Sequence, residues 1–144
     1  MEKQQKYWTI AIMLIWVFFS GCRKDISSSP NPESKEIFGT WVWVQSSGGF
    51  TGHTINPSTV GYSGTVEFNK NGIYKTYKDG NQKEEGKYSL IEGKSIYTTT
   101  TAHLIKYEDD ITYQSINLER KDTLILSDEC YDCYRHVYIR KTNK

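Results

Sequence analysis

Short runs of alternating apolar and polar residues, separated by turn-forming residues, limit the fold of this chain more than any other feature. Because successive side chains of a strand point to opposite faces, each run predicts a β-strand with one face toward a core. No window places apolar residues at helical spacing. The runs are Thr40–Gln45, Thr65–Phe68, Ile73–Lys78, Gln82–Ile91, Ser95–Tyr107, Ile111–Glu119, Thr123–Ser127 and Tyr134–Lys141. These eight runs predict an all-β domain.

The connections predict that each strand pairs with the next one along the chain. Asn71-Gly72 is a dipeptide that favours a tight hairpin, and further turns are predicted at 79–81, 92–94, 109–110 and 120–122. Residues 46–62 form a longer predicted loop. A meander of eight strands can close on itself and leave no exposed edge. We therefore predict an eight-stranded antiparallel up-and-down barrel, with a two-sheet sandwich as the alternative, because strand count does not separate the two.

The N-terminal segment predicts export. Residues 7–19 are apolar and uncharged and follow Lys3 and Lys6, but they are fewer than the about 20 residues that a membrane-spanning helix needs. Phe19-Ser20-Gly21-Cys22 then resembles the bacterial lipobox, in which the cysteine is lipidated and becomes the first residue. We predict three parts: a signal peptide at 1–21, the lipidated Cys22 with a flexible tether at 22–36, and a barrel domain at 37–144.

Lipidation of Cys22 predicts a protein tethered to a membrane, since each buried methylene contributes about 0.8 kcal/mol and more than one acyl chain gives stable anchoring. The expected location is the cell envelope, on the outer membrane, in either the periplasmic or the surface leaflet. The chain has 18 Lys plus Arg against 17 Asp plus Glu. Nucleic-acid binding driven by phosphate neutralisation needs a basic excess or patch, so nucleic acid is excluded as a partner.

Two sequence signals resemble the lipocalins. Gly39-Thr40-Trp41 resembles their Gly-x-Trp signature, and Arg140 resembles the late arginine that packs across that tryptophan. The order of these signals, of Phe68-Asn69-Lys70-Asn71-Gly72 and of the segment 122–128 is similar to the lipocalin-like domains of Bacteroidetes-type lipoproteins. The resemblance implies an eight-stranded barrel with a pocket, and structural roles for Gly39, Trp41 and Arg140. It places Trp41 at the closed end, under Arg140.

The barrel interior is the predicted functional surface. Strand alternation from Val66 directs apolar and tyrosine side chains inward, and such a barrel is either filled by its own side chains or holds one small ligand. The leading prediction is binding of a small, mainly apolar molecule. The predicted ligand-binding residues are Trp43, Phe68, Tyr74, Tyr88, Tyr113 and Tyr138.

The second prediction is an interaction module with a filled core, in which the 46–62 loop contacts an envelope protein or a glycan. An internal cavity would favour ligand binding. A filled interior with an aromatic patch around Phe50 and Tyr62 would favour the interaction module.

Cys130 and Cys133 are predicted to form a disulfide across the last turn, because an exported compartment permits oxidation; free thiols are the alternative. Together with His136 they offer three zinc ligands, but a closed structural site needs a fourth. No metal is therefore predicted, and no other cofactor.

No catalytic residue is predicted. Glu84-Glu85 and Asp109-Asp110 are sequence neighbours, which point to opposite faces of a strand, so both pairs are predicted to be solvated. The three histidines stand outside any known nucleophile motif. The protein is therefore predicted not to be an enzyme, and hydrolase activity is the third and weakest alternative.

Overall fold

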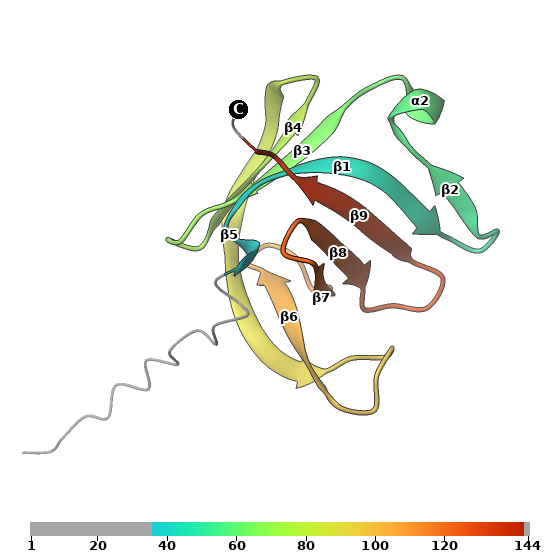
Figure 1. The fold of residues 1–144 in the computed structure, drawn as a ribbon. Coiled ribbons are helices and arrows are strands. Elements are labelled where there is room, and N and C mark those ends of the chain that lie inside the picture. Colours follow the sequence, from blue (N-terminus) through green and yellow to red (C-terminus); the bar gives the residue numbers. More distant parts are fainter. Residues whose placement is uncertain (1–35, 143–144) are drawn as a thin grey trace, which may run out of the picture.

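The computed structural model of the chain describes residues 36–142, and the predicted signal peptide, Cys22 and nearly all of the tether lie outside this range. The strands form one antiparallel sheet in the order β2-β1-β3-β4-β5-β6-β7-β8-β9, and β1 also pairs with β9 (Figure 1). That last pairing closes eight strands into an up-and-down barrel, as the sequence predicted. The elements are β1 (Gly39–Gly48), β2 (His53–Ile55), α2 (Pro57–Val60), β3 (Gly64–Phe68), β4 (Ile73–Lys78), β5 (Asn81–Lys94), β6 (Thr101–Tyr107), β7 (Tyr113–Glu119), β8 (Thr123–Asp128) and β9 (Tyr134–Arg140).

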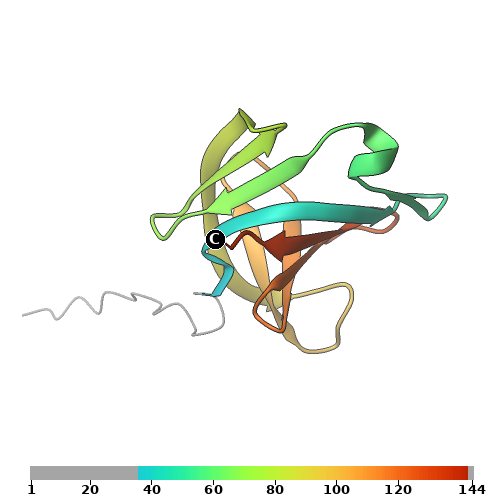
Figure 2. The same cartoon turned by 45° about the horizontal axis from the view of Figure 1, so that its top comes forward.

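The long strand β1 lies between β3 and β9 (Figure 2). It pairs with β9 along most of its length, with a bulge between Trp43 and Gln45. On its other side it pairs with β3 only as far as Val42, and from Ser46 onward its partner is β2. Strands β1 and β3 therefore separate beyond Val42, which leaves room between them.

The 46–62 segment is more ordered than the predicted loop, because it includes the end of β1, the short strand β2 and the helix α2. Asn56 caps α2: its side chain accepts from the Thr59 backbone N–H, and the Thr59 hydroxyl accepts from the Asn56 backbone N–H. Gly61 ends the helix in the left-handed conformation. The helix has no buried residue, so the sequence contains no apolar periodicity that would have predicted it.

Two predicted boundaries are wrong. The turn predicted at 92–94 lies inside β5, and the connection to β6 is at 95–100. A Cβ on Gly93 would stand 3.0 Å from the Leu104 side chain, so this glycine permits a close cross-strand approach rather than a turn. Strand β7 begins at Tyr113 rather than Ile111, whose side chain is 95% exposed.

The core lies at the closed end of the barrel, around the fully buried Trp41. The indole Nε1 donates to the Ile37 carbonyl at 2.7 Å, and the Arg140 guanidinium lies 4.1 Å from the ring centroid. Arg140 also donates to the carbonyls of Phe38 and Lys121, which ties the residue before β1 and the β7–β8 turn to β9. The buried core residues are Ile37, Trp41, Val66, Phe68, Tyr88, Ile105, Leu124 and Leu126.

Gly39 belongs to the same arrangement. Its φ is +126°, and a Cβ there would stand 3.0 Å from Arg140 Nη1. A side chain would thus be strained by the backbone and would press on the guanidinium. Glycine at this position lets Arg140 lie against the start of β1 and donate to the Phe38 carbonyl.

A disulfide joins Cys130 and Cys133 in the β8–β9 connection. The Cys133 carbonyl accepts from the Gly49 backbone N–H at 3.2 Å, so this connection is fixed to the end of β1. Within residues 36–142, no helix has both the length and the apolar character that crossing a bilayer requires.

Candidate functional site

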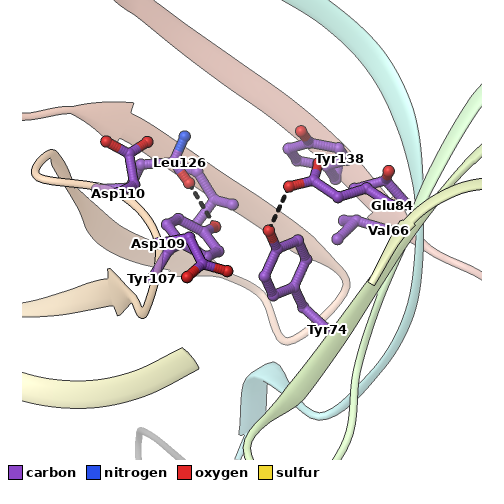
Figure 3. A pocket seen from close by; sticks show the side chains of 10 residues that line it. Val66, Tyr74, Glu84, Tyr107, Asp109, Asp110, Leu126 and Tyr138 are labelled. Atoms are coloured by element: carbon purple, nitrogen blue, oxygen red, sulfur yellow. Dashed lines mark hydrogen bonds between the residues drawn. The ribbon is translucent and has the colours of Figure 1, made fainter. Parts of the chain in front are cut away.

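Beyond the core, the barrel interior holds an open cavity of about 320 Å³. Its lining side chains come from strands β3 to β9 and from the β6–β7 turn (Figure 3). The lining residues are Val66, Tyr74, Thr76, Glu84, Tyr107, Asp109, Asp110, Gln114, Leu126 and Tyr138. We refer to it as the main cavity.

Three tyrosines give the main cavity both aromatic surface and hydroxyl groups. The Tyr74 hydroxyl donates to Glu84 Oε1 at 2.5 Å, and the Tyr107 hydroxyl donates to Gln114 Oε1 at 2.7 Å (Figure 3). The rings of Tyr74 and Tyr107 meet edge to face, with centroids 4.9 Å apart. These contacts hold the Tyr74 and Tyr107 phenols in place before any ligand enters.

The same three phenols remain protonated at neutral pH. Burial, together with the carboxylate of Glu84, raises the pKa of Tyr74 to about 12. Burial also raises the pKa of Tyr138 to about 12 and lifts the pKa of Tyr107 well above 10. All three hydroxyls can therefore donate hydrogen bonds at physiological pH.

Carboxylates dominate the charge of the main cavity. Glu84 comes from β5, and Asp109 and Asp110 come from the β6–β7 turn. Hydrogen bonds from the Thr112 backbone and hydroxyl lower the pKa of Asp110, which favours its ionised form. The lining includes neither Lys nor Arg. The main cavity therefore presents negative charge to whatever enters it.

The predicted ligand-binding residues separate into groups. Tyr74 and Tyr138 line the main cavity. Phe68 and Tyr88 belong to the core instead, where their rings pack edge to face at 5.1 Å. The Tyr88 hydroxyl donates to the Asn69 carbonyl at 2.7 Å, so this side chain is used in closing the barrel end.

Tyr113 lines neither this cavity nor the second one described below. Its neighbour Gln114 faces the main cavity, and Ile116 and Leu118 pack against the core. Alternation along β7 therefore directs Tyr113 to the outer face. The strand predicted from Ile111 has the same alternation, so Ile116 and Leu118 were an available signal that Tyr113 faces outward.

The comparisons gave no relative. No protein-family model, no curated protein and no solved structure matches this chain. The closed eight-stranded barrel is therefore established by the structure itself, and the lipocalin resemblance rests on the residues that carry it.

Sequence reasoning missed the carboxylates of the main cavity. Glu84 lies an even number of positions before Tyr88 and Leu90, and those two were predicted to face inward. Alternation along β5 could therefore have placed Glu84 on the inward face. Glu85 faces the other side and pairs with Lys75 at 3.1 Å. Asp109 and Asp110 lie in a turn, where alternation gives no signal.

A second cavity of about 280 Å³ lies where β1 and β3 separate. Trp43, another predicted ligand-binding residue, lines it, and the Tyr62 ring is stacked 5.9 Å from the Trp43 ring. Phe50 is 91% exposed on the β1–β2 turn. The remaining lining residues are Ser46, Ile55, Gly64, Thr65, Val66, Thr76, Tyr77, His136 and Tyr138, of which Val66, Thr76 and Tyr138 also line the main cavity.

Proposed function

We propose that this protein binds a small molecule inside the barrel and holds it at the cell envelope. The observation that carries the proposal is the open main cavity of about 320 Å³ above a filled core. Ligand pockets usually measure about 300 to 1,000 Å³, so the ligand is small. A cavity of this kind was the feature expected to favour ligand binding over an interaction module with a solid core.

The lining favours a ligand that combines an apolar body with a positively charged or hydrogen-bond-donating group. Val66, Leu126 and the tyrosine rings offer surface to the body of the ligand. Glu84 and the two aspartates offer acceptors to an amine. A mainly apolar molecule, as the sequence predicted, would leave those carboxylates without a partner from the ligand.

The position of Arg140 over Trp41, beside Gly39, is the arrangement that the lipocalin resemblance implies. It supports the proposal that the domain is lipocalin-like. The lipobox-like segment before Cys22 supports the proposed lipid anchor on the outer membrane.

The ligand proposal is tested first by native mass spectrometry of the protein purified from its own envelope. We expect a small-molecule adduct on the unmodified protein. Glu84→Gln should weaken or abolish the adduct, and Glu85→Gln should retain it, because Glu85 is adjacent in sequence but faces the opposite side and pairs with Lys75.

A matched pair of probes tests the proposed charge preference. Tyramine carries an amine, and 4-ethylphenol has nearly the same body without it. Because a hydrogen bond to a charged group contributes about 1.5 to 3 kcal/mol, we expect tyramine to bind about tenfold or more tightly, and Glu84→Gln to remove this preference. Equal affinities would contradict the charge preference. No adduct and no binding of either probe would contradict ligand binding and favour an interaction surface near Phe50.

Replacing Cys22 with serine tests the anchor. We expect the Cys22→Ser protein to leave the membrane fraction or to keep its signal peptide, because serine lacks the thiol that is lipidated. Detergent-phase partitioning and intact-mass measurement report both results. Normal cleavage together with retention in the detergent phase would contradict the proposed anchor.

A further inference from the structure

Ser46, His136 and Asp128 form a connected polar chain at the second cavity. Ser46 of β1 and His136 of β9 are directly opposite in the sheet, and Ser46 Oγ lies 2.7 Å from His136 Nδ1. His136 Nε2 lies 3.5 Å from Oδ1 of Asp128, at the end of β8. Ser46 is 3% exposed, yet it lines the second cavity together with His136.

The β1 bulge brings Ser46 to this place. Trp41 and Trp43 face inward, so strict alternation would direct residue 45 inward and residue 46 outward. The bulge between Trp43 and Gln45 adds one residue and reverses the parity. Bulges re-aim side chains in this way and are frequent next to active sites.

The hydrogen bonds determine where the protons lie. Trp43 Nε1 can only donate, and it donates to Ser46 Oγ at 2.8 Å. The Asp128 carboxylate beside Nε2 favours the tautomer that carries its proton on Nε2, and in that tautomer the Ser46 hydroxyl donates to His136 Nδ1. The Nε2 proton faces Asp128. One lone pair on Ser46 Oγ remains free for a reacting partner.

Asp128 is held in its ionised form. Burial acts to raise its pKa, but hydrogen bonds from His136, Gln114 and the Tyr134 backbone N–H outweigh it and leave the pKa below its usual value. Gln114 Nε2 donates to Oδ1 at 2.8 Å, and the Tyr134 N–H donates to Oδ2 at 3.2 Å. A carboxylate in this position faces Nε2 of His136 and orients the ring toward Ser46.

We propose that Ser46 is a nucleophile activated by His136 and Asp128, and that it attacks carboxylic esters that enter the second cavity. The connectivity is that of a serine–histidine–aspartate triad, with the two ring nitrogens in exchanged roles. Trp43, Ile55 and Tyr62 line the same cavity, which fits an ester with an apolar or aromatic acyl group. This activity goes beyond ligand binding in the main cavity.

The reaction balances with water as the only co-reactant. Ser46 Oγ bonds to the ester carbonyl carbon while its proton moves to His136 Nδ1. The bond from that carbon to the alcohol oxygen breaks, and His136 returns the proton to the departing alcohol. A water then attacks the acyl-serine, giving one proton to His136, and the acid leaves as Ser46 Oγ regains that proton.

Tyr138, whose ring centroid lies 6.5 Å from that of His136, is a candidate donor to the oxyanion of this reaction. It lines the second cavity together with Ser46, and its phenol stays protonated because burial raises its pKa to about 12. A hydrogen-bond donor aimed at the developing negative charge lowers the barrier of acyl transfer.

The test uses the full-length protein in detergent and a biotinylated fluorophosphonate, which phosphonylates activated serines with loss of fluoride. We expect peptide mass spectrometry to find the label on Ser46 of the unmodified protein. Because the label is mapped on the protein without substitutions, the result does not depend on whether a Ser46→Ala variant folds. No labelling, or labelling only at another residue, would overturn the proposal.

Variants then separate a nucleophile from a structural hydrogen bond. Because a general base contributes about 10²-fold or more, His136→Gln should slow labelling at least about 100-fold, and Asp128→Asn about tenfold or more. Ser47→Ala changes the next residue of β1 and should label at the unmodified rate. Hydrolysis of p-nitrophenyl butyrate should follow the same order, with circular dichroism confirming folded variants. A labelling rate that His136→Gln leaves unchanged in a folded protein would also overturn the proposal.

Discussion

Replacing Trp41 with alanine should lower the free energy of unfolding by about 3 to 5 kcal/mol, because it leaves a cavity in a fully buried part of the core. The same change removes the hydrogen bond from the indole to the Ile37 carbonyl and the stacking of Arg140, a contact of about 0.5 to 2 kcal/mol. Urea denaturation monitored by far-ultraviolet circular dichroism measures the loss.

Val42→Ala is the matched control. Val42 is the next residue of β1, faces outward and is partly exposed, so its truncation should cost about 1 kcal/mol or less. Trp41→Phe keeps most of the ring and provides a foldable intermediate if Trp41→Ala does not fold. Equal losses for Trp41→Ala and Val42→Ala would contradict the assignment of Trp41 as the centre of the closed end.

Gly48→Ala should destabilise the barrel by about 3 kcal/mol or more. The Gly48 φ is +142°, and a Cβ there would lie 2.1 Å from the Cys133 carbonyl oxygen. That oxygen belongs to the backbone and cannot rotate away, so the end of β1 must shift against β9. Thermal unfolding of the purified variant gives the size of the effect.

Gly52→Ala separates the clash from backbone strain. Gly52 also has a positive φ, +68°, but a Cβ there would meet no atom within 4 Å. Its substitution should cost about 1 kcal/mol, as expected for a non-glycine residue in that conformation. If both variants lose the same stability, the contact between Gly48 and the β8–β9 connection does not constrain the barrel.

The barrel was predictable from the sequence because its strands are local and consecutive. The alternation of Val66 and Phe68 indicates β3, and Asn71-Gly72 indicates the turn to β4. Gly93 led to a wrongly predicted turn, because the sequence alone does not distinguish a glycine that permits close packing between strands from one that forms a turn. The error does not change the predicted topology, since β5 still pairs with β6.

The candidate sites were less predictable, because they depend on contacts between distant residues. Ser46 and His136 are 90 positions apart, and they meet only through the register of β1 with β9. A bulge that reverses the facing of Ser46 leaves no mark in a single sequence. Glu84 could have been found by alternation, whereas Asp109 and Asp110 reach the main cavity from a turn.

Closure of the barrel by its first and last strands constrains how the chain can acquire its fold. The Phe38 carbonyl and Arg140, which are 102 positions apart, are joined by a hydrogen bond at that seam. As the chain becomes available from its N-terminal side, β1 through β8 can form hairpins in order, but the seam stays open until β9 is free to pair. Until then β1 has a free edge toward solvent, which is the state in which such a chain is most open to aggregation and to capture by chaperones.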